Sequence, residues 1–138
     1  MGNLEKLSSQ QLSAFTKLKA LQSSDDAVNI VLQYDAQITA ASQNYGIPKE
    51  IIQATIYREQ VCLGIDDPFA DSQVRSYYLG VDGAARTDSS TGPGQIFAWV
   101  AIDAECALND QCTLNKNNPS HIWTVWQNLQ DPTYNIKH

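Results

Sequence analysis

Glu59 is the residue of this sequence best suited to acid–base chemistry, because it lies among apolar residues in a segment with helical spacing. One stripe of a helix predicted over residues 48–63 holds Ile52, Ile56, Glu59 and Leu63. A carboxyl group in the middle of an apolar face is desolvated, which favours its neutral form. A neutral carboxylic acid can protonate the leaving oxygen of a glycosidic bond. Two other interpretations remain open: an ion pair with a buried arginine, or a stripe that ends at the surface.

Residues 88–96, with the sequence DSSTGPGQI, form a polar loop that leads into the apolar segment 96–102. Its two glycines, Gly92 and Gly94, would let a ligand approach the backbone closely. The hydroxyl groups, the amide of Gln95 and the N–H groups of the helix start could all hydrogen-bond that ligand. The same residues would also suit an ordinary capped helix start, so this loop alone does not identify a binding site.

Three segments resemble, in the same order, motifs of the lytic transglycosylases and goose-type lysozymes. Residues 45–59, YGIPKEIIQATIYRE, are similar to the helix that ends in the catalytic glutamate of that family. Residues 90–96, STGPGQI, are similar to its Gly-Leu-Met-Gln motif with the preceding serine. Residues 131–136, DPTYNI, are similar to an Asn-Ile pair that precedes a tyrosine-bearing helix. Each motif is short, but three in the family's order argue against coincidence.

The resemblance implies a mainly α, lysozyme-like fold and cleavage of peptidoglycan at the β-1,4 bond between N-acetylmuramic acid and N-acetylglucosamine. It implies that Glu59 is the general acid/base and needs no metal or other cofactor. Ser90, Gly92 and Gln95 would contact the glycan or shape the site, and Asn135 would contact or support it. Residues 1–138 are then a single domain, in which residues 45–136 carry the motifs and residues 1–44 are an N-terminal helical extension.

The sequence departs from the family pattern at three places. Pro93 and Gly94 replace the usual Leu-Met pair, which removes apolar packing from the middle of the motif. The 30 residues between Glu59 and Ser90 make a longer insertion than many members have. The sequence also ends two residues after Ile136, where the family continues into its tyrosine-bearing helix. A truncated C-terminus is therefore one interpretation.

The identity of a second carboxylate separates two reaction outcomes. A muramidase needs a carboxylate that activates water, and two carboxyl groups about 6.5–9.5 Å apart would give inversion. A lytic transglycosylase needs only Glu59, which returns as a base and directs the muramic acid 6-hydroxyl onto C1. Asp88 is the leading candidate for the second carboxylate, because goose-type lysozymes place an aspartate before their Gly-rich motif. Asp82 and Asp71 are weaker candidates, and any of the three could instead be a cap or loop residue. On this basis muramidase is the leading prediction.

The elements that must position these residues are predicted to be almost entirely helical. Strand-like alternation is sparse, and only the loop near residues 80–90 leaves room for a small β-hairpin. The predicted helical segments are residues 4–21, residues 24–46, residues 48–63, residues 67–79, residues 95–108, residues 121–130 capped by Ser120, and a last fragment opened by Asp131-Pro132.

The cysteines and tryptophans favour structural roles. Cys106 and Cys112 lie six residues apart, so they could close a short disulfide loop, although spacing alone does not decide this. Cys62 shares a helix face with apolar residues and is expected to be a buried thiol. The three cysteines lack zinc-ligand spacing. Trp123, Trp126 and Tyr134 have helical spacing, which favours core packing over sugar stacking.

The net charge of −6 and the scattered basic residues argue against nucleic-acid binding. No apolar run is long enough to span a membrane, and the N-terminus has no signal peptide. We therefore expect a domain of a larger protein that is secreted or delivered to the periplasm or cell wall, for example an antibacterial toxin or effector with an immunity protein as partner. A non-catalytic glycan-binding module on the same scaffold and a helical interaction domain remain alternatives.

Overall fold

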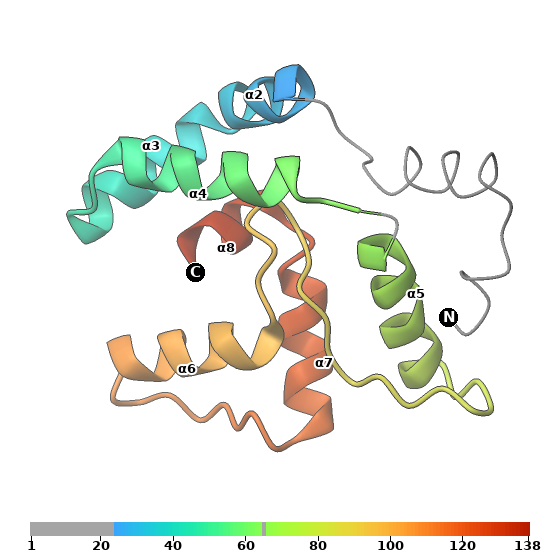
Figure 1. Ribbon diagram of the computed structural model, residues 1–138. Coiled ribbons are helices and arrows are strands. Elements are labelled where there is room, and N and C mark those ends of the chain that lie inside the picture. Colours follow the sequence, from blue (N-terminus) through green and yellow to red (C-terminus); the bar gives the residue numbers. More distant parts are fainter. Residues whose placement is uncertain (1–23, 65) are drawn as a thin grey trace, which may run out of the picture.

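The computed structural model describes residues 24–64 and 66–138, and this part of the chain is mainly helical (Figure 1). Its helices are α2 (Ser24–Gln33), α3 (Asp35–Tyr45), α4 (Lys49–Val61), α5 (Asp66–Tyr78), α6 (Ala98–Leu108), α7 (Pro119–Asn128) and α8 (Pro132–Lys137). The mainly α prediction is confirmed. The helix predicted at residues 4–21 lies outside the described residues.

The segment near residues 80–90, where the sequence left room for at most a small hairpin, forms none, because no residue of 81–90 pairs with another strand. A tight turn from Val81 to Ala84 leads instead into an irregular segment that crosses the molecule. The β pairing lies further along, in an isolated antiparallel bridge between Thr91 and Ile96. This bridge closes the Gly-rich loop rather than forming a hairpin of its own.

Helices α2, α3 and α4 form one layer, which packs around Val31, Ile38 and Ile56. The segment predicted as one helix over residues 24–46 is two helices, because Tyr34 leaves helical geometry with φ −100° and ψ 21°. The break lets α3 change direction while Val31 and Ile38 still reach the same cluster. As predicted, this segment ends at Gly46, whose φ of 67° suits glycine.

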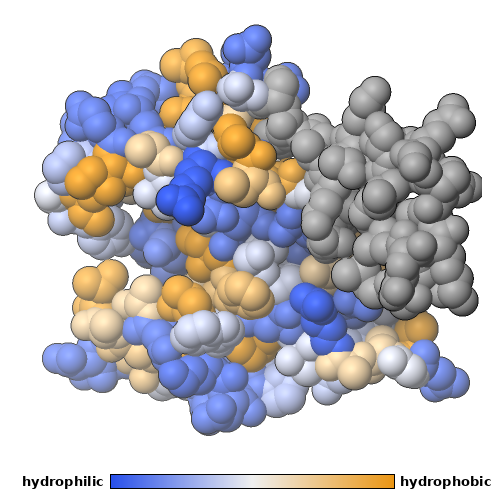
Figure 2. Space-filling model, in the orientation of Figure 1, coloured by the Kyte–Doolittle hydropathy of each residue, from blue (hydrophilic) through white to orange (hydrophobic). Residues whose placement is uncertain are grey.

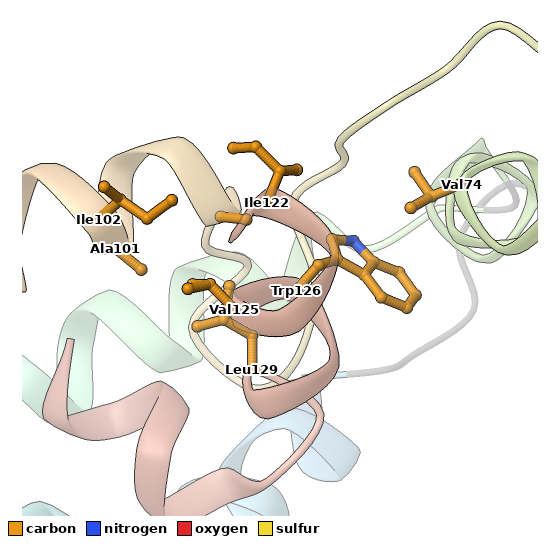
Figure 3. Close-up of a cluster of buried hydrophobic side chains, with 8 residues drawn as sticks. Val74, Ala101, Ile102, Ile122, Val125, Trp126 and Leu129 are labelled. Carbon is orange, nitrogen blue, oxygen red and sulfur yellow. The ribbon is translucent and has the colours of Figure 1, made fainter. Parts of the chain in front are cut away.

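A second, larger cluster joins α5, α6 and α7 (Figure 3). Its largest side chain is Trp126 of α7, which is 1% exposed and extends toward Val74 of α5. Burial of each large side chain of this kind stabilises the fold by about 1.5–3 kcal/mol. The members of the cluster are Val74, Ala98, Ala101, Ile102, Ile122, Val125, Trp126 and Leu129.

An aromatic stack extends this cluster and confirms that the tryptophans pack rather than present sugar-stacking faces. Trp123 lies between two rings, with centroids 4.7 Å from Tyr78 and 5.8 Å from Trp126. The Arg75 guanidinium lies 5.1 Å from the Trp126 ring centroid. Burial, with a smaller effect of Tyr77 and Asp88, raises the pKa of Tyr78 to about 12. The Tyr78 hydroxyl donates to the Thr87 carbonyl at 2.9 Å, which anchors the start of the loop.

The short helix α8 connects the two layers. Ile136 packs against the cluster of the first layer, and Tyr134 packs against the cluster of the second. Asp131 caps α8 by accepting the Thr133 N–H at 2.9 Å, and Pro132 occupies the first turn, where its missing donor costs nothing. Asn135, in the middle of α8, is thereby held between the layers.

Three local predictions are settled by the structure. Helix α7 begins at Pro119 and is capped by Asn118 rather than by Ser120, whose N–H donates to the Asn118 side chain at 2.9 Å. Cys106 and Cys112 form a disulfide, with Cα atoms 5.0 Å apart. Cys62 is exposed rather than buried, because it lies at the C-cap of α4, beyond the packed part of the helix.

Candidate active site

The Gly-rich loop contacts the last turn of α4, the turn that carries Glu59. The buried side-chain amide of Gln60 donates to the Pro93 carbonyl at 2.7 Å. A buried amide that loses its hydrogen-bond partner costs free energy, so this contact fixes the loop against the helix. Two of the segments singled out in the sequence therefore meet next to Glu59.

Asn135 brings the third segment to the same loop. Its side-chain amide donates to the Thr91 carbonyl at 2.8 Å and to the Leu129 carbonyl at 3.1 Å. Its side-chain oxygen accepts the Gly94 N–H at 2.8 Å. Because Asn135 is fully buried, it supports the loop and does not contact a ligand directly. Of the two roles expected for Asn135, the structure therefore favours the supporting one.

The loop needs glycine at position 92 for two reasons. The φ of Gly92 is 73°, in the left-handed region that L side chains rarely adopt. A Cβ atom there would also lie 2.5 Å from the Leu129 carbonyl oxygen and would collide with the Asn135 amide. The close approach of α8 to the loop is thus possible only without a side chain.

Gln95 closes the loop with its own side chain. Its backbone has a φ of 49°, the only positive φ of a non-glycine residue in the described part. Its side-chain amide donates to the Gly92 carbonyl at 2.9 Å, while its side-chain oxygen accepts the Ser90 hydroxyl at 3.4 Å. Among the described residues, the backbone N–H groups of Ser90 and Gly92 have no hydrogen-bond partner. Both N–H groups therefore retain the capacity to donate a hydrogen bond.

Glu59 itself is half-buried, which corrects its predicted place in the middle of the apolar face. The residues of α4 that are buried are Ile56 and Gln60, so the packed face is rotated away from Glu59. The reason is that Gln60, a polar residue, packs inward to reach Pro93. Within residues 24–64 and 66–138, the Glu59 carboxylate makes no hydrogen bond or ion pair. The expected alternative of a buried arginine partner therefore finds no support there.

Asp88 caps α6. Its side chain accepts the N–H groups of Ser89 at 2.9 Å, Ala98 at 3.0 Å and Trp99 at 3.0 Å, and these bonds use both carboxylate oxygens. Burial raises the pKa of the Asp88 carboxyl above its ordinary value, and the three N–H groups oppose this rise. Because of this cap, α6 begins at Ala98 rather than at Gln95 as predicted. A carboxylate with both oxygens so engaged is poorly placed to activate water.

The other two carboxylate candidates are also accounted for. Asp71 accepts the Ser89 hydroxyl at 2.7 Å and the Thr91 hydroxyl at 2.8 Å, again through both oxygens. Asp82 is exposed in the turn that follows α5. Since α5 begins next to the end of α4 and a helix of its 13 residues is about 20 Å long, Asp82 lies far from Glu59.

A pocket of about 330 Å³ lies on the other side of the loop, between α3, α4 and the end of α8. It is mostly apolar and includes Gly94 of the loop, but Glu59 is not among its lining residues. The space-filling view shows a recess between the α3–α4 layer and α6, on the side where the chain ends (Figure 2). The pocket adjoins the loop without containing the carboxylate.

Sequence reasoning did not identify four residues that build the site. Gln60 follows the predicted catalytic residue, and Ser89, Thr91 and Gln130 belong to the network that holds the loop. Gln60 could have been found from the helical spacing, since it lies four residues after Ile56. The others required tertiary structure, because Ser and Thr in a polar loop give no signal of burial.

Comparison with protein-family models, curated proteins and solved structures gave no significant match to this chain. In the described part, no cluster of three or more His, Cys, Asp or Glu side chains is arranged to hold a metal ion. The helices of that part are also too short or too polar to cross a bilayer. What the site can do must therefore be inferred from its own residues.

Proposed function

We propose that this chain cleaves the glycan strands of peptidoglycan, at the β-1,4 bond between N-acetylmuramic acid and N-acetylglucosamine, with Glu59 as general acid/base. We further propose a lysozyme-like fold related to the lytic transglycosylases and goose-type lysozymes. The main support is the Gln60–Pro93 hydrogen bond, which brings the Gly-rich loop to the turn of α4 that carries Glu59. Asn135 adds the third motif to the same place.

In the proposed reaction, Glu59 first gives its proton to the glycosidic oxygen and the bond from this oxygen to C1 breaks. Positive charge develops on C1 and the ring oxygen, and the ionised Glu59 lies beside it. The Glu59 carboxyl group is half-buried and has no hydrogen-bond or ion-pair partner in the described part, so it can turn toward the glycosidic oxygen. The N–H groups of Ser90 and Gly92 would orient the sugar against this residue.

The engagement of the other carboxylates favours transglycosylation over hydrolysis. Asp88 and Asp71 both use their two oxygens to hold the loop and α6, so neither carboxylate can turn toward a water molecule without breaking these bonds. In transglycosylation Glu59 removes the proton from the muramic acid 6-hydroxyl, and O6 forms a bond to C1. Glu59 is protonated again, and the product is a 1,6-anhydro sugar that contains no added water.

The substrate also defines where the protein would act. We propose that it is delivered to the cell wall or periplasm, since a net charge of −6 does not favour unaided approach to an anionic wall. Periplasmic expression in bacteria should lyse cells, and cytoplasmic expression should not. Equal growth in both cases would contradict the proposal.

Two variants of α4 test the proposed function. Glu59→Gln keeps the shape of the side chain but removes its acid–base capacity, whereas Glu50→Gln removes an exposed carboxylate from the first turn of the same helix. We expect wild type and Glu50→Gln to release soluble fragments from purified peptidoglycan. Glu59→Gln should be slower by a factor of about 10²–10⁴, the usual contribution of a general acid. Binding of the wild type to peptidoglycan without release would instead indicate a non-catalytic glycan-binding module.

A further inference from the structure

We propose that Asp71 is a positioning residue for this reaction: an ionised carboxylate on α5 that holds residues 89–91 of the loop at the Glu59 site. The effect of Asp71 on turnover rests on the proposed function, whereas its role in holding the loop rests only on the hydrogen bonds. Asp71 accepts from two loop hydroxyls, those of Ser89 and Thr91, at 2.7 and 2.8 Å. Both hydroxyl residues are almost completely buried, with 1% and 0% of their surface exposed.

The indole of Trp126 determines the direction of the first bond. Its Nε1–H can only donate, and it lies 3.0 Å from the Ser89 hydroxyl oxygen. Ser89 therefore accepts from Trp126 and must give its own hydrogen to Asp71. The receiving oxygen of Asp71 must act as an acceptor.

A second donor, Gln130 in the turn that follows α7, acts on Thr91 in the same way. The side-chain amide of Gln130 donates to the Thr91 hydroxyl oxygen at 3.0 Å and to the Trp126 carbonyl at 3.1 Å. Thr91 is then free to donate to the second oxygen of Asp71. Because both oxygens accept, the group that fits this arrangement is a carboxylate and not a carboxylic acid or an amide.

The two bonds to Asp71 hold the loop on both sides of Ser90. Ser89 and Thr91 both point to α5, while Ser90 between them donates to the Gln95 side chain instead. Thr91 also pairs with Ile96 across the base of the loop. Ser90 lies between the two residues that Asp71 holds, and Gly92 directly follows the second of them, Thr91. The backbone N–H groups of Ser90 and Gly92, which have no partner in the described part, are therefore held in place by Asp71.

Asparagine at position 71 would not reproduce this arrangement. Its amide offers one acceptor oxygen, and its NH₂ group would face a hydroxyl that already receives a hydrogen bond from Trp126 or Gln130. One loop hydroxyl would lose its acceptor and the loop would shift. A displacement of about 1 Å at a reacting group can reduce turnover by about 100-fold.

The test combines a spectroscopic and a kinetic measurement on Asp71→Asn, with Asp103→Asn as the matched control. Asp103 is exposed and pairs with Lys116 at 2.7 Å, away from the loop. The protein has three tryptophans, so its indole N–H signals are few enough to be assigned by nuclear magnetic resonance. In Asp71→Asn we expect the Trp126 signal to shift and to exchange at least tenfold faster with solvent. Turnover of soluble glycan strands should fall by about 10–100-fold in kcat with KM changed less than threefold.

A milder variant keeps the proposal testable where Asp71→Asn unfolds. Thr91→Val removes one of the two hydroxyls and leaves the Trp126–Ser89 bond in place, so in this background the single acceptor oxygen of Asp71→Asn can still serve Ser89 and should cause much less further loss of kcat or stability than in the native background. The proposal is overturned if Asp71→Asn in the native background leaves the Trp126 signal unchanged, or if it turns over as fast as wild type. An inactive wild type with a shifted Trp126 signal would instead contradict the proposed function and leave Asp71 only its role in holding the loop.

Discussion

The last turn of α4 and the loop at residues 88–96 are in contact, yet they differ in how their polar groups are satisfied. In the loop, Asp88, Ser89 and Thr91 all have hydrogen-bond partners within the protein. On the helix, the Glu59 carboxylate has none among the described residues. The difference indicates that the side chains of Asp88, Ser89 and Thr91 fix the loop, whereas no described neighbour fixes the Glu59 carboxylate.

A side chain added at Gly92, where the loop and α8 are closest, should reduce stability more than any other change. Gly92→Ala introduces a side chain at a φ of 73° and forces a collision with the Leu129 carbonyl and Asn135. We expect a loss of more than about 3 kcal/mol in the free energy of unfolding, measured by urea denaturation.

Gly83→Ala is the matched control, because Gly83 has a φ of 81° but no atom within 4 Å of the added Cβ. Gly83→Ala introduces the backbone strain without a collision, so it should lower the free energy of unfolding by only about 1 kcal/mol. Equal losses in the two variants would show that the close approach of α8 to the loop contributes nothing.

Asn135→Ala should have the next largest effect. It removes three hydrogen bonds at once and leaves the Gly94 N–H and the Leu129 carbonyl without this partner, whereas the Thr91 carbonyl keeps the Ile96 N–H. We expect a loss of about 2–4 kcal/mol in urea denaturation. Asn109→Ala, at an exposed residue that accepts one N–H, is the control and should change stability by less than about 1 kcal/mol. An Asn135→Ala protein as stable as wild type would contradict the described role of α8.

A smaller effect is expected at the end of α8, where Glu105 and His138 interact at 2.5 Å. The hydrogen bond from His138 lowers the pKa of Glu105, and the nearby charges of His138 and Lys137 act in the same direction, against the effect of burial. A lowered folded-state pKa contributes stability above the ordinary pKa of glutamate, and this stability is lost as pH falls through the folded-state value.

Glu105→Gln should therefore lower the free energy of unfolding by about 1 kcal/mol at neutral pH, because the carboxylate is partly exposed. The difference from wild type should shrink as pH falls below the folded-state pKa. A difference that grows on acidification would contradict the assignment of the charge to Glu105.

A similarly small effect on stability is expected for Asp88→Asn. Asparagine offers one acceptor oxygen in place of two, so one bond to the start of α6 should be lost and the free energy of unfolding at neutral pH should fall by about 1 kcal/mol. The pKa of Asp88 is raised on folding, so wild type loses stability as pH rises through the folded-state value, and the variant does not. Peptidoglycan cleavage should be retained, whereas a loss of 100-fold or more would restore Asp88 as a second catalytic carboxylate.

The sequence predicted most of the helices because apolar periodicity, Gly46 and the prolines mark their limits clearly. It also placed Glu59, the Gly-rich loop and Asn135 in one hypothesis, and hydrogen bonds now join the three segments. It could not predict which face of α4 packs, because the burial of Gln60 depends on a carbonyl 33 residues away. The cap of α6 was missed for a similar reason, since Asp88 lies ten residues before the N–H group of Ala98 that it binds. The cap of α7 is local, but it was placed at Ser120 in place of Asn118, two residues earlier.

The mass of the soluble products released from purified peptidoglycan tests the central claim most directly. The account predicts that wild type releases fragments one water lighter than reducing muropeptides, and that Glu59→Gln releases almost none. Reducing products would contradict the single-carboxylate mechanism, and Asp67→Asn would then be the next variant, since Asp67 binds the Gly64 N–H through only one oxygen. Equal release by wild type and Glu59→Gln, or no release by either, would contradict the assignment of Glu59 as the catalytic acid/base.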